Sequence, residues 1–253
     1  MWIFKSSIGK KVVMSISGIF LITFLALHGS INLLAVFDAV KYTSTGQAGN
    51  LYNDACTFMG TNILVQIMVP ILALGFLVHI IYALVLTLQN QKARGHNRYV
   101  VSSKTATGWP AKNMLVLGII VLGLLAFHLT GFWARMQLQE WTGGEPAEGF
   151  NLVATFFSSY WVSGLMVVWL IAIWFHLNHG FWSALQTLGL DNSRWFPRLK
   201  VIGLIVTTLI LLTFLVVVVY FNLIYNGPAS MLQAPQTQQV VEQAAQTVTA
   251  MLR

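Results

Sequence analysis

Five apolar stretches, each longer than 20 residues, constrain this 253-residue chain more than any other feature of its sequence. An α-helix needs about 20 apolar residues to cross the roughly 30 Å hydrocarbon core of a bilayer. Only 8% of the residues are charged, against about 25% in an ordinary soluble domain. The sequence therefore predicts an all-α, polytopic membrane protein with five transmembrane helices, at Val12–Phe37, Asn62–Leu88, Asn113–Leu138, Tyr160–Leu188 and Leu199–Tyr225.

The same composition excludes several other classes of protein. So apolar a chain is not a water-soluble globular protein. The net charge of +7 does not indicate a nucleic-acid binder, because the basic residues are scattered between apolar blocks. The single cysteine, Cys56, excludes a disulfide framework, a cysteine-ligated iron–sulfur cluster and covalent haem attachment through C-x-x-C-H.

Lysine and arginine are distributed unevenly between the loops, and this bias predicts the orientation in the membrane. The N-terminal arm and the loops after the second and fourth stretches carry eleven basic residues and one acidic residue. The segments on the opposite side carry three basic and six acidic residues. We therefore expect a cytoplasmic N-terminus and an outer C-terminus. Apolar residues at helical spacing in 227–253 predict an extracytoplasmic tail with a short amphipathic helix.

Five of the six histidines lie inside the predicted spans, at His28, His79, His128, His176 and His179. Titratable side chains at membrane depth are costly and are usually functional. A single such histidine is also explained by a hydrogen bond between helices. That explanation weakens here, because four successive helices each carry a histidine near mid-depth and the fifth carries none.

The depth of each histidine sorts four of them into two pairs. At about 1.5 Å rise per residue, His28 and His128 lie in the outer half of the membrane. His79 and His176 lie roughly 8 Å closer to the cytoplasmic face on the same reckoning. Imidazoles from facing helices can ligate haem iron on both sides in a bundle core. The first four helices are therefore expected to form a haem-binding four-helix bundle with two stacked b haems.

Two further features bear on the haem prediction. Gly75, Gly131 and Gly180 lie one turn from histidines on the same helix faces, where a porphyrin requires backbone without bulk. His179 lies one turn from His176 on nearly the same face, so it is an alternative ligand or a hydrogen-bonding neighbour of a haem propionate or quinone. We favour His176 as the ligand.

Short motifs surround each of the four histidines. They are Ser17-Gly18 with His28 and Asn32, Phe76–Tyr82 around His79, Phe127-His128-Leu129, and Phe175–Gly180 around His176. Together with Asn90, Ala93-Arg94 and Tyr99 in the following loop, they resemble the diheme cytochrome b membrane subunit of succinate:quinone oxidoreductases. The closer similarity is to the single-chain anchor of menaquinone-using bacterial succinate dehydrogenases and fumarate reductases.

The resemblance implies a function for the whole assembly. A flavoprotein subunit and an iron–sulfur subunit would dock on the cytoplasmic face of a bacterial inner membrane. Electrons would pass through the inner and outer haems of a cytochrome b domain, 1–226, to a quinone, which the resemblance implies to be menaquinone. The dicarboxylate active site would lie outside this chain. Trp174 stands where one branch of the family has a membrane glutamate, so the proton path through that residue is not expected here.

A quinone needs an apolar slot with one or two hydrogen-bonding groups near the terminal haem. The polar residues at the outer ends of the spans are Asn32, Asp38, Gln66 and Arg135. The competing location is the cytoplasmic side near the inner haem, where the polar residues are Arg98, Lys104 and His179.

Two other functions remain open from the sequence. The first is a diheme cytochrome b that serves a hydrogenase or a formate dehydrogenase, whose ligands are generally distributed differently among fewer helices. The second is a transporter with a histidine proton relay. Such a transporter usually has carboxylates inside its spans, and this sequence has none between the helix ends.

Overall fold

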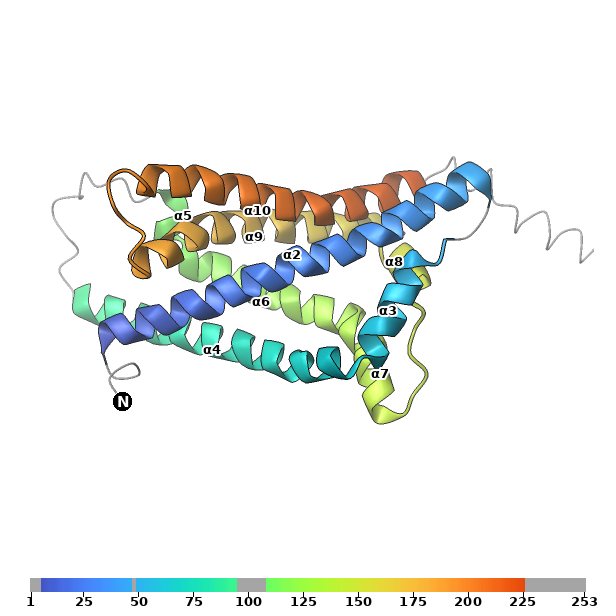
Figure 1. The fold of residues 1–253 in the computed structure, drawn as a ribbon, viewed down its shortest axis with the longest axis horizontal. Helices are drawn as coiled ribbons and strands as arrows, with labels where there is room; N and C mark the ends of the chain where they lie inside the picture. Colours follow the sequence, from blue (N-terminus) through green and yellow to red (C-terminus); the bar gives the residue numbers. More distant parts are fainter. Residues whose placement is uncertain (1–5, 47–48, 95–107, 226–253) are drawn as a thin grey trace, which may run out of the picture.

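The computed structural model describes residues 6–46, 49–94 and 108–225, and the statements below concern these residues. Their regular elements are all helices (Figure 1). Five are long and apolar enough to cross a membrane: α2 (Ser7–Thr45), α4 (Ile63–Arg94), α6 (Met114–Gly131), α9 (Tyr160–Thr187) and α10 (Phe196–Val219). The all-α prediction is confirmed, and the five candidate spans support a multi-pass membrane protein. The predicted tail at 227–253 lies outside the described residues.

Short helices lie at the two ends of the bundle. One end carries α3 (Leu51–Thr61), α7 (Gln137–Thr142) and α8 (Gly149–Phe156), which together we call the cap (Figure 1). The other end carries α5 (Trp109–Lys112). A 3₁₀ turn, η1 (Trp133–Arg135), joins α6 to α7, and α10 continues into a π-helical turn, η2 (Tyr220–Tyr225).

Helix α2 is longer than the apolar stretch that predicts it. It begins where the Ser6 side chain accepts a hydrogen bond from the Gly9 amide, at 3.0 Å. It continues past Phe37 to Thr45, because no glycine or proline interrupts the more polar segment, and it ends at Gly46 with a left-handed φ of 69°. Its 39 residues correspond to a length of about 58 Å. That exceeds the thickness of a hydrocarbon core, so α2 is tilted or projects beyond the bilayer.

The third long helix is shorter than predicted. The sequence predicts a helix to Leu138, because Trp133, Met136 and Leu138 extend the apolar pattern. In the structure α6 ends at Gly131, and the chain turns through η1 into α7. The apolar residues after Gly131 therefore belong to the turn and the cap.

The bundle is built around α2, which packs along α4, α9 and α10. Helix α9 also packs along α10 and α6. The larger core cluster lies toward the cap and contains Ala35, Val36, Ala39, Tyr52, Val153, Phe157, Met166, Val217, Val218 and Phe221. By contrast, no described residue of α4 is fully buried, and α6 buries only Leu117. The two helices that carry His79 and His128 are thus the least buried of the five.

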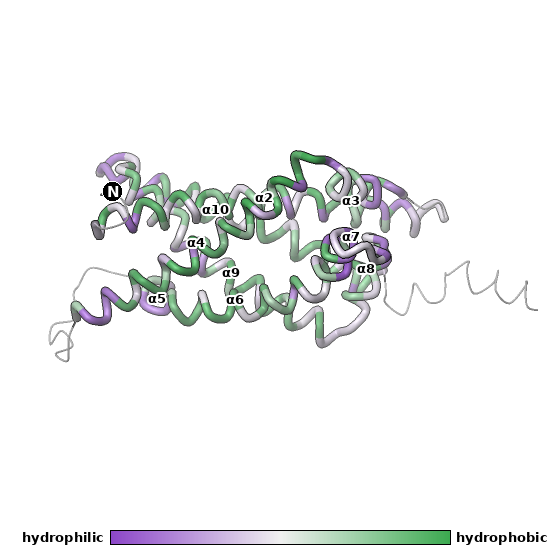
Figure 2. Tube along the Cα trace, turned by 90° about the horizontal axis from the view of Figure 1, so that it is seen from below, coloured by the Kyte–Doolittle hydropathy of each residue, from purple (hydrophilic) through white to green (hydrophobic). Residues whose placement is uncertain are grey.

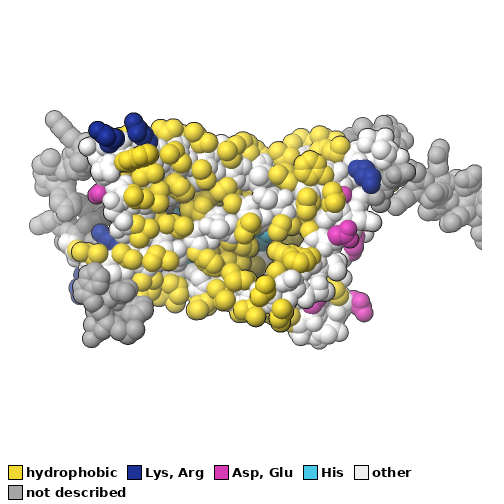
Figure 3. All heavy atoms as spheres, viewed as in Figure 1, with side chains coloured by type: hydrophobic (Ala, Val, Ile, Leu, Met, Phe, Trp, Pro, Cys, Tyr) yellow, Lys and Arg dark blue, Asp and Glu magenta, His cyan; other side chains and the backbone are white. Residues whose placement is uncertain are grey.

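The distribution of side chains along the bundle fits a membrane. Apolar residues run through its middle, and hydrophilic residues gather at both ends (Figure 2). On the face in Figure 3, lysine and arginine lie mainly at one end, and aspartate and glutamate mainly at the end that carries the cap. The two ends of the bundle therefore differ in charge, in agreement with the uneven distribution of basic and acidic residues between the loops. Which end faces the cytoplasm stays a prediction.

Candidate functional site

Four histidines from four different helices meet in two pairs inside the bundle. The ring centroids of His28, on α2, and His128, on α6, are 6.0 Å apart, with an interplanar angle of 82°. Those of His79, on α4, and His176, on α9, are 6.3 Å apart, with an angle of 62°. The structure thus brings together the same residues that depth along the sequence sorts into an outer and an inner pair. Ligation of haem by these residues stays a prediction.

The separation of the rings fits shared coordination of one metal ion. Two imidazoles that ligate a metal from opposite sides, each at about 2 Å, have ring centroids roughly 6 Å apart. Within the described residues, no group of three His, Cys, Asp or Glu side chains could hold a metal ion. Each pair therefore consists of two imidazoles without a third such side chain beside them in the described residues.

Aromatic side chains surround the outer pair. Phe24 stacks on the His28 ring at 5.2 Å, and Phe214 lies 5.6 Å from the same ring. The His128 ring contacts Phe132 at 5.1 Å and Trp169 at 5.3 Å. The outer pair thus lies among rings of low polarity.

The inner pair has a different set of neighbours. The His79 Nδ1 lies 3.2 Å from the Ser17 hydroxyl oxygen on α2. The His176 Nδ1 is the one buried side-chain nitrogen or oxygen in the described residues without a hydrogen-bond partner. A buried polar atom is costly unless a hydrogen bond or a metal ion satisfies it. The Nδ1 atom of His176 therefore has unused hydrogen-bonding capacity within the bundle.

The two pairs are further apart than the sequence estimate of roughly 8 Å. Ser17 marks the level of the inner pair on α2, and His28 lies eleven residues further along the same helix. That spacing corresponds to about 16 Å along the helix axis. The estimate of roughly 8 Å takes Leu88 as the cytoplasmic end of the helix that carries His79. Because α4 continues to Arg94, the depth of His79 cannot be counted from Leu88.

His179 points to a different environment from His176. Its ring packs edge-on against Trp182, with centroids 4.7 Å apart. The Lys200 Nζ lies 4.8 Å from the centre of that same Trp182 ring. The ring that faces His79 is that of His176. The structure therefore groups His179 with an aromatic and cationic cluster rather than with the inner pair.

The three glycines predicted to leave room for a porphyrin have different surroundings. A Cβ added at Gly75 would lie 2.7 Å from the Phe20 ring, and one at Gly131 would lie 2.5 Å from the Phe156 ring. Both glycines thus allow a neighbouring aromatic ring to approach the backbone. A Cβ at the half-buried Gly180 would meet nothing within 4 Å. Of these three glycines, only Gly180 has the predicted open space beside its backbone, and it lies four residues from His176.

Two of the predicted quinone contacts, Asn32 and Asp38, form hydrogen bonds with the cap. The Asn32 amide nitrogen lies 3.5 Å from the His28 Nδ1, and its side-chain oxygen accepts a hydrogen bond from the Tyr52 hydroxyl at 3.3 Å. Asp38 is only 2% exposed, and its carboxylate accepts a hydrogen bond from the Tyr52 backbone N–H at 2.8 Å. Asp38 thus holds the first turn of α3, whereas Asn32 links the outer pair to Tyr52.

The other two, Gln66 and Arg135, lie apart from the histidines in the described contacts. The Gln66 amide nitrogen donates to the Gly60 carbonyl at 2.6 Å, and its oxygen accepts from the Trp141 indole at 2.8 Å. Gln66 therefore ties α4 to the cap. Arg135 lies exposed in η1. The competing cytoplasmic residues Arg98 and Lys104 lie outside the described residues.

Two contacts of the histidine pairs are not predictable from the sequence pattern. Tyr52, which is buried in the cap, is bonded to Asn32. Ser17, which belongs to a short motif in the sequence, contacts His79. A serine on one face of α2, eleven residues before a histidine, carries no signal of its own, because its partner is on another helix.

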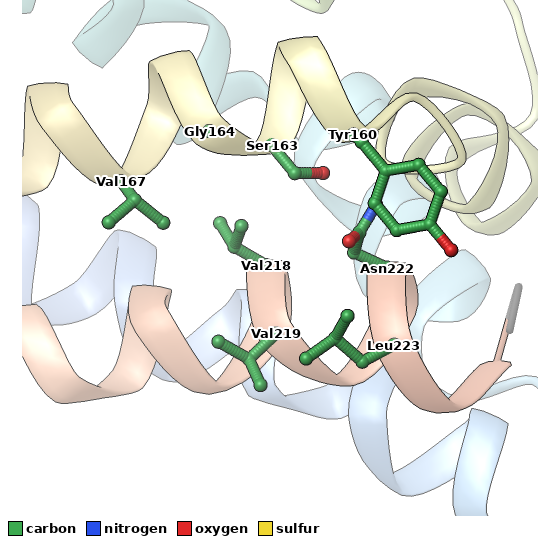
Figure 4. A pocket seen from close by; sticks show the side chains of 8 residues that line it. All are labelled: Tyr160, Ser163, Gly164, Val167, Val218, Val219, Asn222 and Leu223. Atoms are coloured by element: carbon green, nitrogen blue, oxygen red, sulfur yellow. The ribbon is translucent and has the colours of Figure 1, made fainter.

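A shallow groove lies between α9 and α10 near the cap. Its volume is about 230 Å³, and it is lined by Tyr160, Ser163, Gly164, Val167, Val218, Val219, Asn222 and Leu223 (Figure 4). Ser163 and Asn222 both donate hydrogen bonds to the Phe157 carbonyl, at 3.2 and 2.8 Å. None of the histidines lines this groove. Ser163 and Asn222 thus satisfy the hydrogen-bonding capacity of the Phe157 carbonyl between α8 and α9.

Comparison with known proteins adds no further constraint. No protein-family model, curated protein or solved structure matches this chain. The functional argument therefore rests on the residues of the bundle and on their geometry.

Proposed function

We propose that this chain is the membrane-anchor cytochrome b subunit of a bacterial succinate:quinone oxidoreductase. The observation that carries the proposal is the two stacked histidine pairs, each with ring centroids about 6 Å apart, the separation of roughly 6 Å expected for two imidazoles on one metal ion. The resemblance of the surrounding motifs supports the choice of this enzyme class. The open face at Gly180, one turn from His176, supports a bound macrocycle.

Each pair would hold one b haem, which supplies reversible one-electron chemistry at its iron when bound. The four histidines would act as axial ligands through neutral imidazole nitrogens. His79 and His176 would hold the inner haem, and His28 and His128 the outer one. Phe24, Trp169 and the other rings around the outer pair would exclude water from it. Two layers at different depths would connect the two sides of the membrane.

The proposed partners dock at the basic end. An iron–sulfur subunit, with its flavoprotein partner, would bind there and pass electrons to the inner layer. Described basic residues at this end are Lys10, Lys11, Lys92, Lys112, Arg194, Arg198 and Lys200. The positive-inside rule accounts for the same charges, so they suit docking without requiring it. Quinone, in this proposal menaquinone, would exchange electrons with the outer layer.

Haem content in purified membranes tests the proposal. We expect two b-type, low-spin haems per chain in a reduced-minus-oxidised spectrum and a pyridine haemochrome assay. His28→Ala and His128→Ala should remove the same haem, and His79→Ala and His176→Ala should remove the other. His96→Ala, in a predicted loop, is the matched control and should retain both. A spectrum without any b-type band would refute the proposal.

Co-purification tests the choice of enzyme. A tagged chain extracted in mild detergent should retain a flavoprotein and an iron–sulfur protein, and the complex should oxidise succinate with a quinone acceptor. Peptides of a hydrogenase or a formate dehydrogenase in their place would assign the same haem geometry to a different enzyme.

A further inference from the structure

Ser17 contacts a histidine of the inner pair from a third helix. We propose that Ser17 is a positioning residue that fixes the orientation and the tautomer of His79, and thereby sets the reduction potential of the inner haem. This inference rests on the proposed function, because it concerns the haem that His79 would ligate. It adds a residue on α2 to a layer whose two ligands lie on α4 and α9.

The hydrogen bonds of Ser17 determine the tautomer. The Ser17 hydroxyl donates to the Met14 carbonyl at 3.0 Å, and its oxygen lies 3.2 Å from the His79 Nδ1. A hydroxyl has one proton and two acceptor sites. When that proton is donated to Met14, the Ser17 oxygen is left to accept from the His79 Nδ1–H, which is the tautomer that we assign. The lone pair of the imidazole is then on Nε2, the nitrogen available to iron.

A nearby serine on the same helix shows that local bonding does not explain this contact. Ser15 is 6% exposed and Ser17 is 8% exposed. The Ser15 hydroxyl donates to the Lys11 carbonyl at 2.9 Å, within α2. Serine hydroxyls commonly form such bonds to a preceding turn. In the described residues, Ser17 also contacts a histidine on α4, whereas Ser15 has no such contact.

Gly18 completes the contact between α2 and the His79 ring. A Cβ added at Gly18 would lie 3.4 Å from the His79 Cε1 and 3.8 Å from its Nδ1. The ring therefore lies against bare backbone at one residue and against a hydroxyl at the adjacent one. Together, Ser17 and Gly18 restrict both the position of the ring and its rotation about χ2.

The inner pair is consequently asymmetric. The His79 Nδ1 has an acceptor, whereas the His176 Nδ1 has no hydrogen-bond partner in the described residues. An acceptor on the outer nitrogen of a ligating imidazole makes the inner nitrogen a stronger donor. A stronger donor favours ferric over ferrous iron. Loss of the Ser17 hydroxyl should therefore shift the inner haem toward the ferrous state.

Redox titration of the purified complex, with electron paramagnetic resonance of the ferric haems, tests this inference. At a fixed potential, Ser17→Ala should raise the ferrous-to-ferric ratio of the inner haem about tenfold and change its ferric spectrum. The outer haem should keep its potential. Ser15→Ala removes a hydroxyl of similar burial from the same helix and should change neither haem. Ser17→Thr retains a hydroxyl and should restore the original inner potential.

The outcomes separate this inference from the function on which it rests. Two haems with an unshifted inner potential in Ser17→Ala, or an equal shift in Ser15→Ala, would overturn the role of Ser17 alone. If Ser17→Ala fails to incorporate the inner haem, recovery of that haem in Ser17→Thr supports the positioning role, and its continued absence overturns it. Absence of haem from the unaltered complex would overturn the proposed function itself.

Discussion

His176 and His179 are three positions apart, and their rings pack against different side chains. The first faces His79 across the bundle, and the second packs against Trp182. Their sequence spacing places both on nearly one helix face, so the pattern alone left the ligand open. The contacts on α4 and α10 distinguish them, and those contacts join segments that are far apart in the sequence.

His179→Gln should therefore retain both haems, because the ring opposite His79 is unchanged. His176→Ala should lose the inner haem. The haem-to-protein ratio and the low-spin spectrum of each purified variant measure this directly. Loss of the inner haem from His179→Gln, together with its retention in His176→Ala, would reverse the assignment.

Cys56 in the cap has an unusually weakly acidic thiol. Burial raises the pKa of Cys56 from an ordinary value of 9.0 to about 11. A hydrogen bond with Tyr52 lowers the pKa, whereas the nearby Glu148 and Glu140 carboxylates raise it further. Burial also raises the pKa of Tyr52. The folded cap therefore keeps the Cys56 proton between pH 9 and 11 while an unfolded chain loses it. The stability of the cap falls as the pH rises through this range.

Alkylation of Cys56 should follow this shift. A two-unit rise in pKa lowers the thiolate fraction at pH 8 about a hundredfold relative to an ordinary cysteine. Iodoacetamide labelling, followed by mass spectrometry, should accelerate up to about pH 11. Thr57→Cys in a Cys56→Ala background gives an exposed comparison on the same helix. A midpoint near pH 9 for Cys56 itself would contradict the effect of burial.

At the scale of elements, the long helices were predictable and the cap was not. Apolar windows of about 20 residues locate α2, α4, α6, α9 and α10, since membrane helices are defined by such windows. They do not resolve α3, α7 and α8, which have 11, 6 and 8 residues and mix polar with apolar side chains. The pairing of histidines followed from helix direction and depth. The contacts of Ser17, Asn32 and Tyr52 depend on helix rotation, which the sequence pattern does not specify.

Two glycines of α9 test whether a macrocycle lies along the histidine-bearing face of that helix. A side chain at Gly180 or at Gly164 would meet nothing within 4 Å in the described protein. Gly180 is half-buried near His176, whereas Gly164 is exposed and borders the groove between α9 and α10. Gly180→Leu should lower occupancy of the inner haem, and Gly164→Leu should not. Equal occupancy in the two purified variants would exclude this placement of the porphyrin.

For the whole molecule, the proposed function would give electron flow a direction, because the two histidine layers lie at different depths between oppositely charged ends. The outer pair lies toward the cap, and the inner pair toward the basic end. With a negative cytoplasm, an electron that moves outward gains about 2.3 kcal/mol per 100 mV. The membrane potential would therefore drive succinate oxidation by a low-potential quinone at the outer layer.

An uncoupler should accordingly slow succinate oxidation by the native quinone in intact, energised cells. The same uncoupler should have no effect on the detergent-solubilised complex with a high-potential quinone analogue, which serves as the control. Oxygen consumption with succinate reports the first rate, and dye reduction the second. An unchanged rate in energised cells would place quinone reduction on the cytoplasmic side.

If the chain transfers electrons as proposed, the continuity of α2 bears on the speed of that transfer. One unbroken helix carries both Ser17, against the inner layer, and His28, in the outer layer. Electron tunnelling slows exponentially with distance, so a small change in the gap between the layers changes the rate greatly. A bilayer of different thickness alters the tilt of a helix, but it does not alter the roughly 16 Å between two residues eleven positions apart on it. Under the proposed function, helix α2 would therefore keep the tunnelling distance constant across membranes of different lipid composition.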